Sequence, residues 1–140
     1  MPIKFDPMSK SFKAFSVGTL VVDPINRALG TELETADVWV SKACHEHIAR
    51  DHADDYALIM ENFAEIIRSP TFAGQDPKHG ENFYVVRRIA GPSDNEHVLV
   101  AIGLSVSQFG TYNVRTAYRI KQEDVDRRRL RKSLIPVLPI

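Results

Sequence analysis

The apolar residues of this chain follow a helical period in its first half and a strand period in its second. The clearest helical pattern places apolar side chains every three or four positions from Tyr56 to Ile67, with polar residues between them. Asp54 or Asp55 is a suitable N-cap, and Ser69-Pro70 ends the pattern because proline disfavours helix in the residue before it. The chain therefore contains one strongly amphipathic helix near its middle.

Shorter elements are expected before this helix. An Asp-Pro start and a glycine stop predict a helix from Pro24 to Leu29, and Ser41 caps a second helix that runs to about His52. The β-prone runs Phe12 to Val17 and Val38 to Val40 predict short strands.

The second half reads as an antiparallel meander. Strands are predicted from Phe83 to Ala90, from His97 to Ser107 and from Tyr112 to Ile120, with turns at residues 91–95 and at Gly110. Apolar residues alternate along the middle strand, which suits a central position with one buried face. The three strands pair in chain order.

A final helix completes the predicted fold. Its acidic residues come early, at positions 123, 124 and 126, and its basic residues lie between 127 and 132, an order that complements the helix dipole. We therefore expect an α+β fold, with N-terminal helices packed on an antiparallel sheet of three or four strands. We expect one domain over residues 1–140, with a loosely held segment at 1–11 and an apolar tail at 134–140 that lies on the domain or on a partner.

Composition excludes several classes of protein. The chain has 140 residues, of which 44% are hydrophobic and 26% charged, as expected of a globular domain. Eighteen basic residues balance eighteen acidic ones, so any nucleic-acid partner must be bound by a local patch. The single cysteine cannot form an intramolecular disulfide, and the N-terminus lacks a secretory pattern, so a cytoplasmic protein without membrane contact is expected.

Three histidines occur close together beside the second predicted helix. On that helix His52 falls on the inward stripe and His47 at its edge, while His45 lies farther round. Histidine transfers protons readily near neutral pH, so His47 and His52 are candidate catalytic residues; the alternative is that they are surface or capping residues. Zinc-binding helices carry histidines four residues apart, a spacing that His45-Glu46-His47 lacks, and no metal or other cofactor is expected.

Hydroxyl and guanidinium groups on the predicted strands supply candidate phosphate ligands. Thr116 and Tyr118 point to the same side of the third strand, where two hydroxyls could hold one phosphate, although both are also ordinary strand residues. Arg115 and Arg119 are expected on the opposite face, and Arg87 is a further cation that could bind phosphate.

The basic end of the last helix is a separate candidate. Arg127, Arg128 and Arg131 could contact a nucleic-acid backbone. The simpler alternative is a solvated helix end, because the helix dipole already accounts for where these charges lie.

The order of these features resembles the phage-associated branch of the barnase, EndoU, colicin and RelE group of small nucleases. The resemblance covers about Val38 to Ile120 and includes a Val-x-Val-Ser strand and cap, the helix with its histidines, the Ser69-Pro70 stop and a late Thr-Ala-Tyr strand. It implies metal-independent cleavage of RNA to a cyclic phosphate. His52 or His47 would act as base or acid, Arg87 would stabilise the developing charge, and Thr116 and Tyr118 would orient the phosphate.

Two other functions fit the same residues. The domain could be a catalytically inactive binding or assembly module of phage origin, or an enzyme that uses its histidines on a small substrate in a closed pocket. A nuclease would have RNA as its partner and could have an immunity protein, and the binding module could have a phage assembly protein. The residues do not indicate an oligomeric state.

Overall fold

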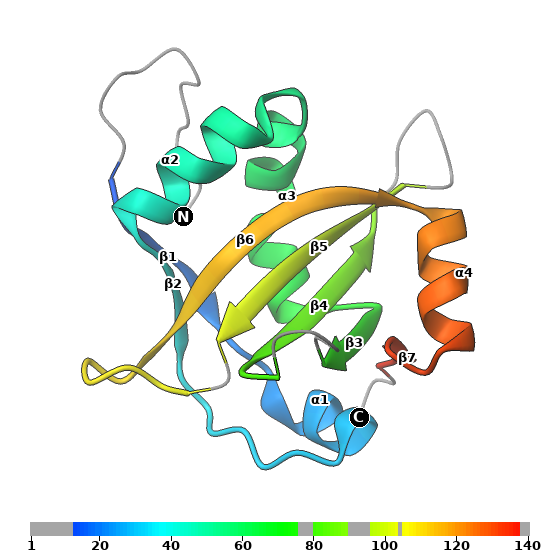
Figure 1. Ribbon diagram of the computed structural model, residues 1–140. Helices are drawn as coiled ribbons and strands as arrows, with labels where there is room; N and C mark the ends of the chain where they lie inside the picture. Colours follow the sequence, from blue (N-terminus) through cyan, green and yellow to red (C-terminus); the bar gives the residue numbers. More distant parts are fainter. Residues whose placement is uncertain (1–12, 76–79, 90–95, 104, 138–140) are drawn as a thin grey trace.

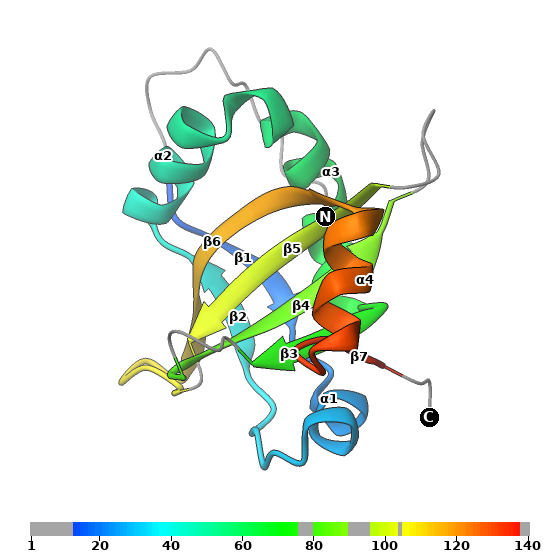
Figure 2. The same cartoon turned by 45° about the vertical axis from the view of Figure 1, so that its right-hand side comes forward.

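A computed structural model describes residues 13–75, 80–89, 96–103 and 105–137. Figures 1 and 2 show one twisted sheet with α3 on its far side and α4 on its near side. The helices are α1 (Val22–Leu29), α2 (Lys42–Asp51), α3 (Tyr56–Arg68) and α4 (Gln122–Leu130), with a 3₁₀ turn η1 (Ala53–Asp55). The strands are β1 (Phe15–Thr19), β2 (Asp37–Val40), β3 (Phe72–Gln75), β4 (Asn82–Arg88), β5 (Glu96–Gly103), β6 (Thr111–Lys121) and β7 (Ile135–Pro136).

The predicted α+β class and the β4-β5-β6 meander are confirmed, but the sheet is larger than expected. Over the described residues its seven strands lie in the order β1-β2-β6-β5-β4-β3-β7, and only the β2 and β6 pair is parallel. Neither β3 nor β7 was predicted, because β7 has two residues and β3 contains an Ala-Gly pair of low β propensity. The first eleven residues, the turn at 91–95 and Phe12 lie outside the described residues.

The predicted cap of α2 and end of α1 are confirmed, but the expected Asp-Pro start of α1 is wrong, because the helix begins at Val22 and Asp23 lies inside its first turn. Ser41 caps α2 by accepting a hydrogen bond from the Cys44 backbone N–H at 3.1 Å, and Gly30 ends α1 in the left-handed conformation at φ 67°. The expected cap of α3 is wrong, because Asp55 occupies the N-cap position without a side-chain hydrogen bond. The short turn η1 supplies the entry to α3 instead.

Apolar side chains are buried on both faces of the sheet. The larger core lies between α3 and the sheet and includes the inward residues of β5, which are Val98, Val100 and Ile102. A smaller core lies on the other face beneath α4, where Val125 and Leu134 pack with Leu99. The central strands are therefore apolar on both sides.

The apolar tail lies on the domain over its described part. Leu134 is 2% exposed, and β7 pairs with β3. Gly74 of β3 lies directly beneath this return: a Cβ placed there would be 1.8 Å from the carbonyl oxygen of Ser133. The backbone at Ser133 can therefore approach β3 this closely only because residue 74 has no side chain.

We expect Gly74→Ala to lower the free energy of unfolding by about 3 kcal/mol, because backbone must shift to relieve the overlap. Urea denaturation would measure the loss. Gly80→Ala is the matched control, since no heavy atom lies within 4 Å of its Cβ position. Equal midpoints for the two variants would contradict the close packing of the tail on β3.

Candidate active site

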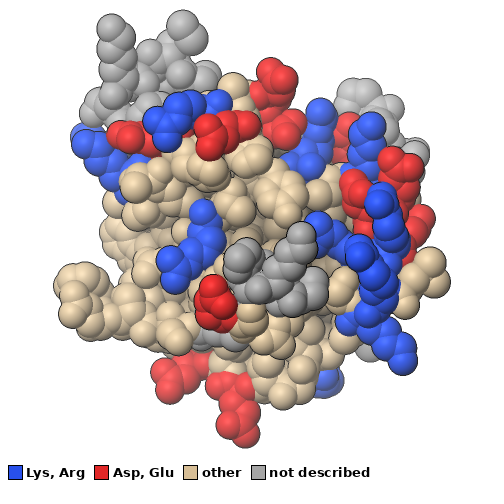
Figure 3. Space-filling view, viewed as in Figure 1, with Lys and Arg blue, Asp and Glu red and all other residues tan. Residues whose placement is uncertain are grey.

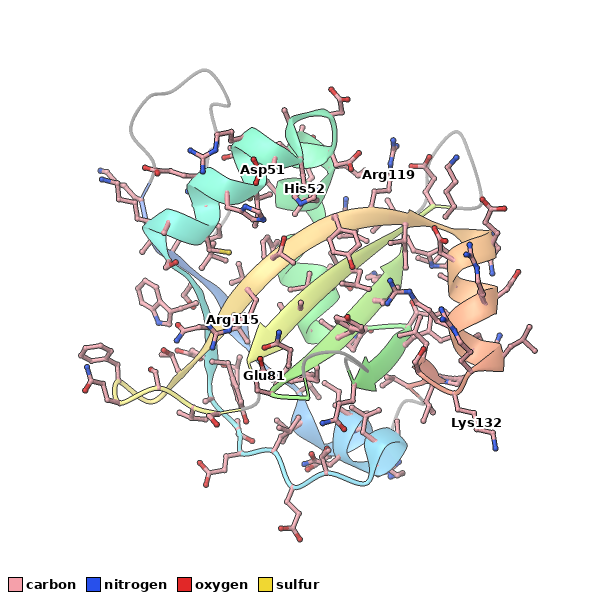
Figure 4. The ribbon with its side chains drawn as sticks, viewed as in Figure 1. Asp51, His52, Glu81, Arg115, Arg119 and Lys132 are labelled. Atoms are coloured by element: carbon pink, nitrogen blue, oxygen red, sulfur yellow. The ribbon has the colours of Figure 1, made fainter. Side chains whose placement is uncertain are left out.

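The last turns of α2 and the middle of β6 bring together four of the predicted site residues. The Nε2 atom of His47 lies 3.2 Å from Oγ1 of Thr116. The rings of His52 and Tyr118 stack with centroids 5.6 Å apart, and the two histidine rings lie edge to face at 5.5 Å. Figure 4 shows His52 at the end of α2 above β6. Residues almost seventy positions apart thus form one cluster.

The position of this cluster follows from the sheet. Strand β6 pairs with β2 over residues 111–113, and beyond that point the edge of β6 has no strand partner on this side among the residues that the structure describes. Helix α2 contacts β6. Because alternate side chains of a strand share a face, Thr116 and Tyr118 both reach the histidines of α2.

Asp51 joins the cluster, although the sequence reasoning did not select it. One of its carboxylate oxygens lies 2.8 Å from Nδ1 of His47, one helical turn away. An ionised carboxylate only accepts hydrogen bonds, so Nδ1–H donates to it, and Nε2 is the ring nitrogen that faces Thr116. The spacing of four residues on a helix was the signal that could have identified this pair.

His52 presents its ring differently. It is the C-cap residue of α2, and its ring is held by stacking on Tyr118 and by the edge contact with His47. Among the described residues neither of its ring nitrogens has a hydrogen-bond partner. Both nitrogens therefore remain available to a bound molecule.

His45, which was not preferred, has a structural position. It is 6% exposed, its Nδ1 lies 3.0 Å from the carbonyl oxygen of Lys13, and its Nε2 lies 2.5 Å from the hydroxyl of Tyr56. A carbonyl oxygen cannot donate, so Nδ1–H donates to Lys13 and Nε2 accepts from Tyr56. The ring ties α2 to the start of the described chain and to α3.

Arg87 is not brought to the cluster, which corrects the expected position of the cation. It extends from β4 on the α3 side of the sheet, donates a hydrogen bond to the carbonyl oxygen of Ser69 at 2.5 Å and lies 3.7 Å from a carboxylate oxygen of Glu65. Strand periodicity alone does not show which side of the sheet carries the histidines, so the side on which Arg87 lies could not be matched to theirs from the sequence.

Arg115 is on the near face of the sheet, and the expectation that it lies opposite Thr116 is wrong. A register shift between Ala101 and Ile102 makes one residue of β6 irregular, which breaks the alternation at this point. The guanidinium of Arg115 consequently lies over Gly103, with Nε and Nη2 each 3.3 Å from the Cβ position there. Figure 4 shows Arg115 in front of the sheet, beside Glu81.

The charge of Arg115 reaches α2. Burial raises the pKa of the Cys44 thiol to about 11, and the positive charge of Arg115 acts in the opposite direction. Cys44 lies three residues before His47, so the charge of Arg115 acts on the helix that carries His47. In the described part of the chain, Arg115 has no ion pair. Arg119, by contrast, is bound to Asp55 and Glu96 at 3.1 and 2.9 Å and is structural.

The basic residues of α4 lie on the same face of the sheet as the cluster, at the opposite edge from α2 (Figure 1). Figure 3 shows a column of lysine and arginine side chains along this helix. Arg127 pairs with Asp124 at 2.8 Å, Arg128 lies over the ring of Tyr84, and Arg131 is the exposed C-cap residue. None of the three touches the histidine cluster.

In the part of the chain that the structure describes, no group of three histidine, cysteine, aspartate or glutamate side chains is arranged to hold a metal ion. No helix in this part of the chain is long and apolar enough to cross a membrane.

Comparison with known proteins places the chain in a family. No curated protein and no solved structure matches it significantly. The family model described as phage-Barnase-EndoU-ColicinE5/D-RelE like nuclease 3 matches residues 16–127, which include α2, β6 and every residue of the histidine cluster. The chain therefore belongs to this family of barnase, EndoU, colicin and RelE-like nucleases.

Proposed function

We propose that the chain is a metal-independent endoribonuclease that cleaves RNA by attack of the 2′-hydroxyl on the adjacent phosphate. The observation that carries this proposal is the placement of His47 between Asp51 and Thr116, with the second imidazole of His52 5.5 Å away. Two imidazoles beside one hydroxyl-lined surface can supply a general base and a general acid without a metal ion.

His47 is the proposed base. Asp51 accepts the hydrogen bond from Nδ1–H, which fixes the tautomer and leaves the Nε2 lone pair directed at Thr116. A 2′-hydroxyl bound beside Thr116 would give its proton to Nε2 as its oxygen attacks phosphorus. Thr116 and Tyr118 would orient the phosphate through their hydroxyl groups.

His52 is the proposed acid. As the new 2′-oxygen–phosphorus bond forms, the bond from phosphorus to the 5′-oxygen breaks, and protonated His52 gives its proton to that oxygen. The products are a 2′,3′-cyclic phosphate and a free 5′-hydroxyl. One proton is taken and one is given, so no external reactant is needed.

Arg115 replaces Arg87 in this proposal as the group that stabilises the developing negative charge. Its guanidinium lies on the same face as Thr116 and has no ion pair among the described residues. A guanidinium binds phosphate oxygens bidentately and keeps its charge at any physiological pH. Arg87 is occupied by Ser69 and Glu65 on the far side of the sheet.

The decisive experiment uses a DNA oligonucleotide that contains one ribonucleotide, incubated in excess chelator. Cleavage after the ribonucleotide alone, with a cyclic-phosphate end, is the expected result, because DNA lacks the attacking hydroxyl. An oligonucleotide that is entirely DNA is the matched control, and Thr116→Val tests the orienting hydroxyl at nearly constant side-chain volume. Intact ribonucleotide at high concentrations of folded protein would overturn the proposal and favour a binding or assembly domain.

A further inference from the structure

Two rows of neighbouring side chains cross the near face of the sheet from the histidine cluster to α4. In the first row Thr116 pairs with Ala101, which pairs with Tyr84. In the second, Tyr118 of β6 is followed by Leu99, Val86 and Phe72 on the next three strands. Each row begins at a residue that contacts a histidine of α2 and ends at an aromatic ring.

An arginine of α4 lies over each of the two aromatic rings at which the rows end. The guanidinium carbon of Arg128 lies 5.4 Å from the centroid of Tyr84, and that of Arg129 lies 5.3 Å from the centroid of Phe72. Contact with an aromatic face orients a guanidinium and limits its motion without neutralising its charge. The two cations are thus held on the same side of the sheet as the histidines.

Arg128 and Arg129 also differ from the neighbouring Arg127 in whether a carboxylate pairs with them. Arg127 is paired with Asp124. Within the described residues Arg128 and Arg129 have no carboxylate partner, so their charges are available to an anion. Both follow residue 127, the last residue that the family model matches.

We propose that Arg128 and Arg129 bind backbone phosphates that flank the cleaved bond, so that a single strand of RNA runs across the strands from α2 to α4. This proposal rests on the proposed function. Adjacent strands lie about 4.8 Å apart, which places the Tyr84 ring roughly 10 Å and the Phe72 ring roughly 14 Å from the β6 residues of their rows. A dinucleotide bound at the histidines would not extend to α4, whereas a longer strand would.

The substrate is single-stranded because the proposed reaction requires it. Attack in line with the leaving oxygen needs a backbone that is free to rotate, and unpaired RNA offers splayed nucleotides that an A-form helix does not. Binding through phosphates gives no base preference on this side, so the preference is for length and strandedness rather than for sequence.

The test compares kcat/KM for a dinucleotide with that for oligonucleotides lengthened on the 5′ side or on the 3′ side of the same cleaved bond. Lengthening on one side should raise kcat/KM by about tenfold for each phosphate that an arginine contacts. The double variant with Arg128→Gln and Arg129→Gln should lose this gain and its salt dependence while it cleaves the dinucleotide at the normal rate. Arg127→Gln, whose arginine is already paired, is the matched control and should keep the gain.

The proposal would be overturned if the double variant kept the rise in kcat/KM with oligonucleotide length. It would also be overturned if lengthening on the 5′ side and on the 3′ side raised kcat/KM equally and no arginine variant changed either rise. Failure of the proposed function has a different signature, because the wild-type protein would then leave every substrate intact. In that case, binding of a fluorescent RNA with 2′-deoxy substitution at the scissile position still tests the arginines. Weaker binding by the double variant than by Arg127→Gln would support their contact with phosphate, and equal binding would contradict it.

Discussion

Replacing His47 by alanine is expected to lower kcat for RNA cleavage by about a thousandfold, because the step then lacks a positioned base. The side chain is 38% exposed and contributes little to the cores, so the variant should remain folded. Asp51→Asn should lower kcat in the same direction, since an amide can donate to Nδ1 and so favour the other tautomer of His47. Lys42→Ala, at the exposed start of the same helix, is the control and should behave as wild type.

The roles of the two histidines can be separated with a substrate whose leaving oxygen is replaced by sulfur. A thiolate leaves without a proton, so the acid becomes unnecessary while the base does not. His52→Ala should therefore recover most of its activity on the sulfur substrate, and His47→Ala should not. Recovery by His47→Ala alone would reverse the assignment of base and acid, and full activity of both variants on ordinary RNA would remove the cluster from the mechanism.

Arg115→Gln is expected to lower kcat by about a hundredfold or more, the usual effect of losing one group that stabilises transition-state charge. Its guanidinium lies over Gly103 on the face that carries the histidines, and no core packing depends on it. Glutamine keeps a polar side chain of similar reach but removes the charge. The loss should appear mainly in kcat, because the charge develops only as the phosphate is attacked.

Arg87→Gln is the matched control for this prediction. It removes the same charge from the other face of the sheet, where the guanidinium binds the Ser69 carbonyl group and approaches Glu65. We expect near-normal kcat and a loss of about 1 kcal/mol in the free energy of unfolding from the broken hydrogen bond. A kcat reduced as strongly as in Arg115→Gln would return the charge-stabilising role to Arg87.

The elements that depend on neighbouring residues could be predicted from the sequence. The apolar period determined α3, Ser41 and Gly30 determined helix ends, and strand alternation correctly put Thr116 and Tyr118 on one face. These are interactions over a few residues, whose physical causes are present in any short segment of the chain. The same local logic extends to His47 and Asp51, whose spacing of four residues was visible but not used.

Other features arise only when distant segments meet. The pairing of β3 with β7, the parallel pairing of β2 with β6 and the irregularity beside Ala101 depend on contacts between residues far apart in the chain. That irregularity turns Arg115 toward the near face, and the packing of α3 leaves Arg87 on the other. Local pattern thus determined that Thr116 and Tyr118 share a face, whereas tertiary structure decided that Arg115 joins them and which face meets α2, because strand register and helix docking are set by the burial of the whole core.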